Sequence, residues 1–352
     1  MTGNRSPTLI SSQAMDSTTP YYALGDDRDN PERPFSILDS VIGKALKRSG
    51  LHPDEVEHMG LFMGSSSYDL RSSELAFQQQ LEAKQPDAFP VKYSGSSRLS
   101  DWVGDRFNIT GDAFNINTAC TSSANALLLA RQMLNQGIFR HALVIGIELF
   151  NETTLGGFSG LQLLATEHIS PFDKQRDGLL LGEGCAAVVL GSDDHDSPFW
   201  LVGGGTSFDP HSITAANEEG ASIADAILSA LNDSGMTQSD IVAIKAQGSG
   251  SHINDLAESR GLQRAFRTVN PAIFNSRHSK VGDVPGWRGV GSRDAAVKPP
   301  PYMDAQVSRE AGSRKRPGMD SRRPHQPGTS PTHTDPANGS VNKIPPVTAI
   351  KP

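Results

Sequence analysis

The sequence has little cysteine and no long apolar run, and the stretch after Phe274 has neither leucine nor phenylalanine. With only Cys120 and Cys185 in 352 residues, a fold stapled by disulfides is excluded. No run approaches the roughly 18 apolar residues of a membrane span, and the first residues lack the apolar core of a secretory signal. The sequence therefore predicts a cytoplasmic protein without a membrane span, in which each cysteine is either a buried hydrophobe or a nucleophile.

The end of the sequence differs in composition from the rest. After Phe274, 78 residues remain, and they hold 12 of the 23 prolines. They carry +7, from 13 Lys and Arg against 6 Asp and Glu, which leaves −14 on residues 1–274 because the whole chain carries −7. A segment without large apolar side chains cannot offset the entropy of ordering itself, so residues 273–352 are predicted to be a disordered Pro/Arg/Gly-rich tail. The acidic body and the scattered tail charges argue against a nucleic-acid partner.

Strands and helices alternate through the rest of the sequence. Residues 1–34 are polar and are expected to form a flexible arm. From Phe35, apolar residues follow a helical period as far as Gly50, a typical helix stop. Further helices are expected at 73–84, 121–136, 218–231 and 255–266, and strands at 59–64, 111–118, 141–149, 185–190 and 241–246. This alternation indicates a layered α/β fold.

Cys120 lies where the strand at 111–118 meets the helix at 121–136, which is apolar nearly all round, as expected of an enclosed central helix. Thiolate is the reactive form of cysteine, and the unpaired N–H groups at a helix N-terminus favour that anion. The same N–H groups could hold a carbonyl oxygen as it becomes an oxyanion. These residues alone leave open whether Cys120 is a nucleophile or a packed core residue. Cys185, among Ala, Val and Leu, is predicted to be a core residue.

Four blocks of sequence, in a fixed order, resemble the β-ketoacyl-acyl-carrier-protein synthases. Asn115–Leu128 (NINTACTSSANALL) is similar to the family's active-site turn, whose nucleophile falls on Cys120. Ser170–Gly184 (SPFDKQRDGLLLGEG) resembles the family's PFD…RDG…GEG segment, and Ser234–Ala246 (SGMTQSDIVAIKA) resembles the passage before its first histidine motif. Ala246–Phe266 (AQGSGSHINDLAESRGLQRAF) is similar to that motif itself. The resemblance spans about residues 35–272.

The resemblance implies a thiolase-like layered α-β-α-β-α fold, with the N-terminal half complete and the C-terminal half incomplete. It implies a two-stage reaction, in which the cysteine first takes an acyl group from an acyl-carrier protein as a thioester. Malonyl-carrier protein is then decarboxylated, and its enolate attacks the thioester in a Claisen condensation, with two histidines stabilising the enolate. It also implies a homodimer, or a heterodimer with another ketosynthase, and neither a cofactor nor a metal.

The first histidine position of the family is occupied by Gln247. A glutamine amide can donate a hydrogen bond but cannot carry a proton or become a cation. Because the loss of a whole oxyanion donor reduces rates by about 10²–10³-fold, a weaker donor is predicted to slow condensation rather than abolish it. His252, five residues further on, is interpreted as a surface histidine.

The family's second histidine motif, Lys-Ser-x-x-Gly-His, and its Gly-Phe-Gly loop are both missing, and residues 275–283 hold a histidine and a lysine in the wrong order. Asp255 and Glu258 match carboxylates that brace the lysine of that motif, and they are predicted to lack their partner. Glu183 and Asp177 match acids that organise hydrogen bonds. The abrupt change after Phe274 suggests that a shift of reading frame, natural or from sequencing, replaced the C-terminal third.

Several functions remain open on this basis. The first is a condensing acyltransferase of fatty-acid or polyketide/polyene synthesis, impaired by the missing motif. The second is a non-catalytic partner subunit similar to chain-length factors, which the lost histidines favour and the retained Cys120 disfavours. The third is an inactive truncated product. A thiolase acting on coenzyme A thioesters fits less well, because the PFD…RDG…GEG block is typical of the synthases.

Overall fold

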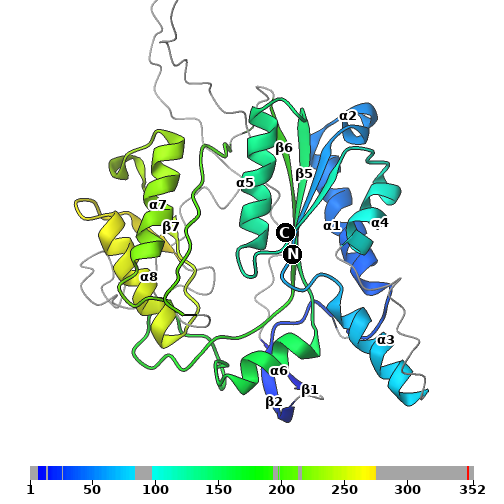
Figure 1. Ribbon diagram of the computed structural model, residues 1–352, viewed down its shortest axis with the longest axis horizontal. Coiled ribbons are helices and arrows are strands. Elements are labelled where there is room, and N and C mark those ends of the chain that lie inside the picture. Colours follow the sequence, from blue (N-terminus) through cyan, green and yellow to red (C-terminus); the bar gives the residue numbers. More distant parts are fainter. Residues whose placement is uncertain are drawn as a thin grey trace, which may run out of the picture. The chain divides into compact units, whose positions relative to one another are not determined.

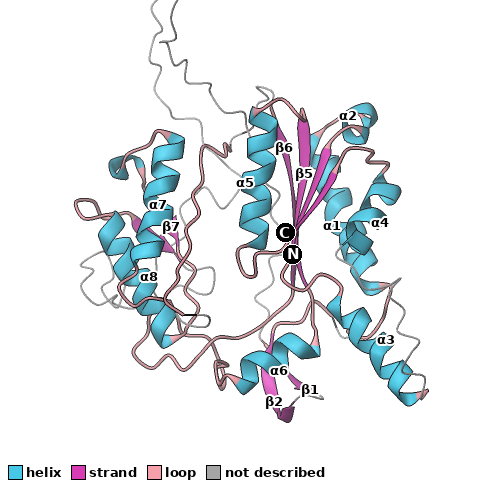
Figure 2. Cartoon of the chain, in the orientation of Figure 1, coloured by secondary structure: helices cyan, strands magenta, loops and turns pink. Residues whose placement is uncertain are grey.

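The computed structural model describes residues 7–12, 15–25, 27–83, 97–192, 197, 199–212, 216–274 and 347–348. The strands are β1 (Thr8–Ser12), β2 (Met15–Tyr21), β3 (Gly60–Gly64), β4 (Ala113–Ile116), β5 (His141–Glu148), β6 (Gly184–Gly191), β7 (Ala243–Lys245), β8 (Ala272–Phe274) and β9 (Val347–Thr348). The helices are α1 (Arg33–Ser49), α2 (Pro53–Glu57), α3 (Leu70–Glu82), α4 (Ser97–Phe107), α5 (Ser122–Asn135), α6 (Glu152–Gly160), α7 (Ala221–Ser234), the short 3-10 helix η2 (Gln238–Asp240) and α8 (His252–Ala265). Helices alternate with strands along most of the chain, as the sequence predicts (Figure 2).

The main sheet has five strands in the order β4-β3-β5-β6-β9, and Figure 1 shows β5 and β6 side by side within it. β3 pairs in parallel with both β4 and β5, so Met63 lies between Asn115 and Ile145. β6 runs antiparallel to β5. Because β3, β4 and β5 are parallel, their carboxyl ends meet at one edge of the sheet, where ligand sites of open α/β sheets form. The segments that follow Gly64, Ile116 and Glu148 are therefore neighbours.

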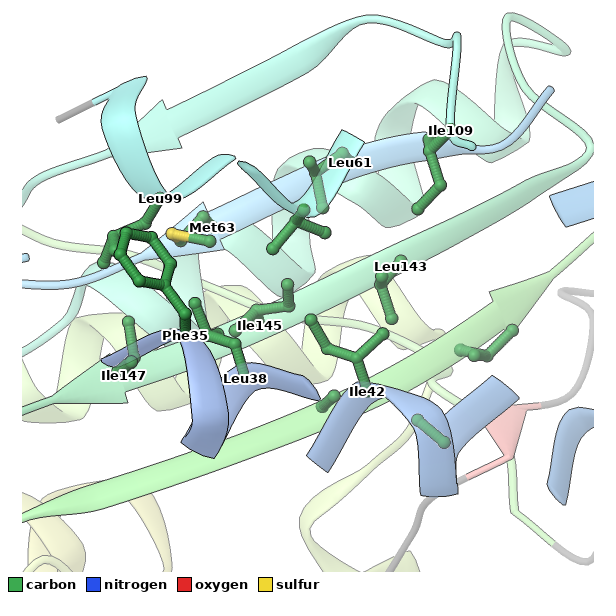
Figure 3. Packing of buried hydrophobic residues seen from close by; sticks show 14 of the residues in the cluster. Phe35, Leu38, Ile42, Leu61, Met63, Leu99, Ile109, Leu143, Ile145 and Ile147 are labelled. Carbon is green, nitrogen blue, oxygen red and sulfur yellow. The ribbon is translucent and has the colours of Figure 1, made fainter. Parts of the chain in front are cut away.

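The larger hydrophobic core lies between this sheet and the helices α1 and α4 (Figure 3). Alternate residues of β3 and β5 point into it, since successive side chains of a strand face opposite sides. Helix α1 adds residues spaced three or four apart, and it ends at Gly50, whose φ of 69° is left-handed. The helix expected from Phe35 to Gly50 is thus confirmed. The residues labelled in this core are Phe35, Leu38, Ile42, Leu61, Met63, Leu99, Ile109, Leu143, Ile145 and Ile147.

Helix α5 covers the opposite face of the sheet, where it packs on Phe62, Ala142 and Val144. Its fully buried residues, Ser122, Ala126, Ala130 and Leu134, recur every four positions and so form a single stripe. The other apolar side chains of α5 are half-buried or exposed. The expectation of a helix enclosed on all sides is therefore wrong for the part of the chain that the structure describes, because the sheet there covers only one side of α5.

The N-terminal residues do not form a loose arm where they are described. β1 and β2 pair as an antiparallel hairpin, with Ile10 opposite Thr19. Ile10 and Tyr21 pack on Phe150 and Leu155, and the rings of Tyr21 and Phe150 meet edge to face at 5.7 Å. Tyr22 then exchanges backbone hydrogen bonds with the segment around Glu183. The prediction of a flexible arm over residues 1–34 is thus wrong for this part of the chain, because its few apolar side chains pack into a small core.

A second, smaller set of elements follows residue 220. β7 and β8 form a two-stranded parallel sheet, in which Ile244 lies opposite Ile273. Helices α7 and α8 pack on it through Ala224, Leu262 and Phe266. The helix and strand expected at 218–231 and 241–246 are confirmed, and α8 starts slightly earlier than the expected 255. Among the described residues no helix is both long and apolar enough to cross a membrane.

Candidate active site

Cys120 lies in the turn between β4 and α5, and its side chain is exposed. The preceding residue, Ala119, has a φ of 53°. A residue other than glycine in this left-handed region is strained by roughly 1–3 kcal/mol, and such strain is concentrated at functional sites. We call residues 117–121 the elbow. It presents the sulfur directly ahead of the first turn of α5, as the sequence predicts.

Side-chain hydroxyls hold the elbow to the start of the helix. Ser122, which is only 2% exposed, donates from Oγ to the carbonyl oxygen of Ala119 at 2.6 Å and accepts from the Thr118 N–H at 2.9 Å. Thr121 Oγ1 donates to the Thr118 carbonyl oxygen at 2.8 Å. Asn125 Nδ2 donates to Thr118 Oγ1, also at 2.8 Å. These bonds link the strained turn to rigid helix, which fixes the direction in which the sulfur faces.

Two glycines let α5 lie close to the sheet. A Cβ atom on Gly64 would come within 2.5 Å of the backbone carbonyl of Ser122, and one on Gly146 would come within 3.0 Å of Ser123 Cβ. Contacts under 3.0 Å are not tolerated between such atoms. Only glycine at the end of β3 therefore allows the first turn of α5 to sit where it does.

The carboxyl end of β5 carries a group that the sequence reasoning missed. Glu148 accepts hydrogen bonds from the backbone N–H of Ser66, from Ser67 Oγ at 2.8 Å and from Ser65 Oγ at 3.2 Å. We call Ser65–Ser67, which follows β3, the serine loop. A signal for this contact was available, since an acid that ends an apolar strand of a parallel sheet must lie beside the loops that follow the neighbouring strands.

Cys185 lies in β6 opposite Ile147, where it is half-buried and packs against the larger core without being one of its buried members. Burial raises the pKa of its thiol to about 12. The two cysteines therefore differ in setting, since one is exposed at a turn and the other is held in the sheet.

The raised pKa of Cys185 predicts a difference in reactivity and in stability. In the variant Cys120→Ala, iodoacetamide at pH 8 should not measurably label Cys185 until urea unfolds the protein. The unfolded thiol ionises near pH 9 and the folded one near 12, so the free energy of unfolding should fall as the pH rises above 9. Urea melts at pH 8 and pH 10 measure this, and Cys185→Ala should show a smaller loss. Rapid labelling of folded Cys185 at pH 8 contradicts the prediction.

Gln247 lies in the loop between β7 and α8, where its side chain is exposed. Glu258 on α8 anchors this loop, because its two carboxylate oxygens accept the backbone N–H of Gln247 at 2.7 Å and of Gly248 at 2.9 Å. His252 is exposed at the start of α8, as predicted of a surface histidine. Among the described residues, no hydrogen bond or ion pair joins Gln247 to Cys120.

Asp255 connects two of the blocks that the sequence singles out. Its side chain is 1% exposed and accepts the N–H of Phe172 at 2.7 Å and of Gly250 at 3.1 Å. Arg176 Nε lies 3.7 Å from the same carboxylate. The prediction that Asp255 and Glu258 lack the lysine of the missing motif is not contradicted, since no lysine contacts either carboxylate among the described residues. Both carboxylates are satisfied by backbone N–H groups of the loops they hold.

Glu183 forms the most enclosed ion pair of the site region. Arg33 Nη1 and Nη2 donate to its two oxygens at 2.8 and 2.6 Å, and the N–H groups of Leu24 and Phe150 donate at 2.7 and 2.9 Å. Burial alone would raise the pKa of Glu183, but the Arg33 bonds and the two N–H groups outweigh it, so the pKa lies below its ordinary value.

Asp177 accepts from the backbone N–H of Thr166 at 3.0 Å and from its Oγ1 at 2.7 Å. These two bonds hold the pKa of Asp177 below its ordinary value. Across the described residues, no cluster of three or more His, Cys, Asp or Glu side chains could hold a metal ion.

Comparison with known proteins gives one consistent family. Models of the β-ketoacyl synthase N-terminal and C-terminal domains match residues 34–195 and 199–291. The 3-oxoacyl-[acyl-carrier-protein] synthase 2 of Vibrio cholerae is 28% identical over 284 residues, which cover 75% of this chain and 68% of that protein. Probable polyketide synthase 1 of Dictyostelium discoideum is 28% identical over 266 residues, or 70% of this chain but only 8% of that much longer protein.

Solved structures share the fold. One is a ketosynthase in complex with its chain length factor from Xenorhabdus doucetiae, with a TM-score of 0.59 and 23% identity over 74% of this chain and 68% of that chain. Another is a type II polyketide acyl-carrier protein in complex with its ketosynthase, with a TM-score of 0.64 and 20% identity over 73% of this chain and 70% of that chain.

The layered α/β fold with an exposed cysteine at the carboxyl edge of its sheet thus places the molecule in the thiolase-like class. Within that class, the chain belongs to the β-ketoacyl synthase family. The family match ends at residue 291 rather than at the expected 272. The predicted tail over 273–352, the proposed frame shift, His278 and Lys280 lie almost entirely outside the described residues.

Proposed function

We propose that this chain is an acyltransferase of the β-ketoacyl synthase type, with Cys120 as its nucleophile. The observation that supports this most directly is the exposed sulfur at a strained elbow ahead of α5. In the first stage, the Cys120 thiolate attacks the carbonyl carbon of an acyl-carrier thioester. A new C–S bond forms, the bond to the carrier sulfur breaks, and the carrier thiolate leaves and takes up a proton.

In the second stage, a malonyl-carrier thioester loses CO2 and the electron pair of the broken bond forms an enolate. The enolate carbon attacks the acyl carbonyl on Cys120, a C–C bond forms, and the Cys120 thiolate is released. Gln247 serves as the hydrogen-bond donor to the enolate oxygen, and Asp255, Glu258, Asp177 and Glu183 support the loops of the site. A neutral amide stabilises that charge less than a histidine, so condensation is slow relative to acyl transfer.

The proposed partner is an acyl-carrier protein bearing acyl and malonyl groups, in fatty-acid or polyketide synthesis. The relatives named for each pathway and the ketosynthase solved with its acyl-carrier protein support this choice. A dimer, with a second copy or with another ketosynthase, is supported by β4. This strand forms one edge of the main sheet among the described residues, and an open edge is suited to pairing with another chain. A cytoplasmic location remains a prediction from the cysteine content.

The test is acylation followed by mass spectrometry of the intact protein. Incubation with a hexanoyl-acyl-carrier protein should add one hexanoyl group to the wild type and none to Cys120→Ala, while Cys185→Ala should be acylated like the wild type. Malonyl-carrier protein added next should give little 3-oxoacyl product, and Gln247→His should increase it. If the folded wild type takes no acyl group, the assignment of Cys120 as the nucleophile is wrong.

The second candidate is a non-catalytic partner subunit similar to a chain-length factor. Gln247 at the histidine position favours it, and one of the solved relatives is a ketosynthase with such a factor. Under this alternative the folded protein stays unacylated but raises the activity of a separate ketosynthase when mixed with it. A protein that does neither fits the third possibility, an inactive truncated product.

A further inference from the structure

The elbow has a strained backbone, and the residues directly next to it in sequence do not account for how that strain is maintained. Ala119 has a φ of 53°, which is a strained backbone conformation for any residue other than glycine. Ser122 and Thr121 tie the elbow to α5, the helix that follows it directly in sequence. A strained turn of this kind persists only where groups from elsewhere in the fold hold it.

Asn117 supplies such a connection. Its Oδ1 accepts the N–H of Ala119 at 3.3 Å, which satisfies the amide of the strained residue itself. Its Nδ2 donates to the carbonyl oxygen of Ser66 at 3.1 Å, across 51 positions of sequence. One side chain thereby bonds the elbow to the serine loop that follows the neighbouring strand.

The serine loop is in turn fixed by Glu148. The carboxylate accepts the N–H of Ser66 together with the hydroxyls of Ser65 and Ser67, so every serine of the loop bonds to it. Ser65 Oγ also accepts the N–H of Tyr68 at 2.7 Å. The path therefore runs from the end of β5, through the serine loop after β3, to the elbow after β4.

We propose that Asn117, acting with Glu148 through the serine loop, is a positioning residue for Cys120. It holds the elbow so that the sulfur stays ahead of the first turn of α5, where the N–H groups of the helix can orient an acyl carbonyl. This inference rests on the proposed role of Cys120 as nucleophile. Asn117 itself acts only through the backbone of Ala119.

The test compares Asn117→Ala with Asn135→Ala, a matched control that removes an exposed amide at the far end of α5. Hydrogen exchange over residues 113–125 and 64–69 should quicken about two- to tenfold in Asn117→Ala and stay near wild type in the control. Alkylation of Cys120 by iodoacetamide at pH 7 should slow about two- to fivefold, because the sulfur is no longer held ahead of the first turn of α5. Acylation by a hexanoyl N-acetylcysteamine thioester should fall further, by roughly ten- to a hundredfold, because that reaction also needs an oriented carbonyl.

Glu148 provides the second arm. Glu148→Ala should reproduce these changes, and Glu148→Gln, which can still bond the serines, should restore most of the wild-type rates. Because both residues act through one loop, the double variant Asn117→Ala/Glu148→Ala should react no more slowly than the slower single variant. The proposal is overturned if the effects of the two substitutions multiply in the double variant, or if Asn117→Ala matches Asn135→Ala in exchange and alkylation. If the wild type is alkylated but takes no acyl group from the thioester, the proposed function fails, and exchange and alkylation still decide the role of Asn117.

Discussion

Replacing Glu183 with alanine is expected to reduce the free energy of unfolding by about 3–5 kcal/mol, the largest effect of any single substitution considered. The side chain of Glu183 is fully buried and that of Arg33 is 5% exposed. Without the carboxylate, the guanidinium would keep the exposed Asp27 as its only ion-pair partner among the described residues, and the N–H groups of Leu24 and Phe150 would lose their acceptor. An uncompensated buried charge is far more destabilising than the pair is stabilising.

Urea unfolding followed by circular dichroism measures this loss, and Asp39→Ala is the matched control. Asp39 pairs with Arg106 at 2.7 Å, but both side chains are about half exposed. Removing such a surface pair should change stability by only about 0–1 kcal/mol. Equal losses in the two variants would show that burial of the Arg33–Glu183 pair does not matter.

Glu183 also makes the free energy of unfolding depend on pH. The pKa of Glu183 is lower in the folded protein than in the unfolded chain, so its contribution is fully present above the ordinary value of 4.5. That contribution is lost as the pH falls through the folded pKa. The wild type should therefore lose stability more steeply below pH 4.5 than Glu183→Gln does.

The second large effect is expected from Gly64→Ala. The added Cβ would lie 2.5 Å from the carbonyl carbon and oxygen of Ser122 and 2.6 Å from Ser123 Cα. Backbone atoms cannot yield as a flexible side chain does, so α5 must shift away from β3. We expect a loss of about 1–3 kcal/mol of stability, together with loss of Cys120 acylation because the elbow moves with the helix.

Gly43→Ala is the control for this substitution. Gly43 lies within α1, and no atom comes within 4 Å of the position its Cβ would occupy. Alanine favours helix over glycine, so this variant should gain about 0.5–1 kcal/mol. Thermal melts and the acylation assay compare the two. Gly64→Ala with wild-type stability and acylation would mean that the close approach of α5 is dispensable.

The parts of the fold that follow apolar periodicity were predictable from sequence. β3, β5 and β6 are continuous apolar runs, and α1 shows its buried stripe in the spacing of Leu38, Ile42 and Ala45. Cys120 could be placed ahead of α5 because the strand and helix periods change at that point. These elements bury apolar surface, which is the signal that a sequence carries most clearly.

Contacts made by backbone groups were not predictable in the same way. The bonds of Asp255 and Glu258 to loop N–H groups left no signal in the sequence, because every residue type but proline possesses such a group. Asn117 and Glu148 meet through the carbonyl and amide of Ser66 for the same reason. β2 (MDSTTPY) was missed because its polar residues show no alternation, and its pairing depends on β1 and on a segment far along the chain.

The N-terminal hairpin is synthesised long before the segment to which the residues after it bond. The N–H of Leu24 bonds to Glu183, which is translated 159 positions later. At about 5–20 residues per second on the ribosome, this early segment waits roughly 10–30 s for its partner. Because β2 is rich in serine and threonine, it exposes little apolar surface that could aggregate during that wait. The polarity that hides this strand from pattern recognition thus suits a nascent hairpin whose following residues, Tyr22 and Leu24, find their partners only when the middle of the chain emerges.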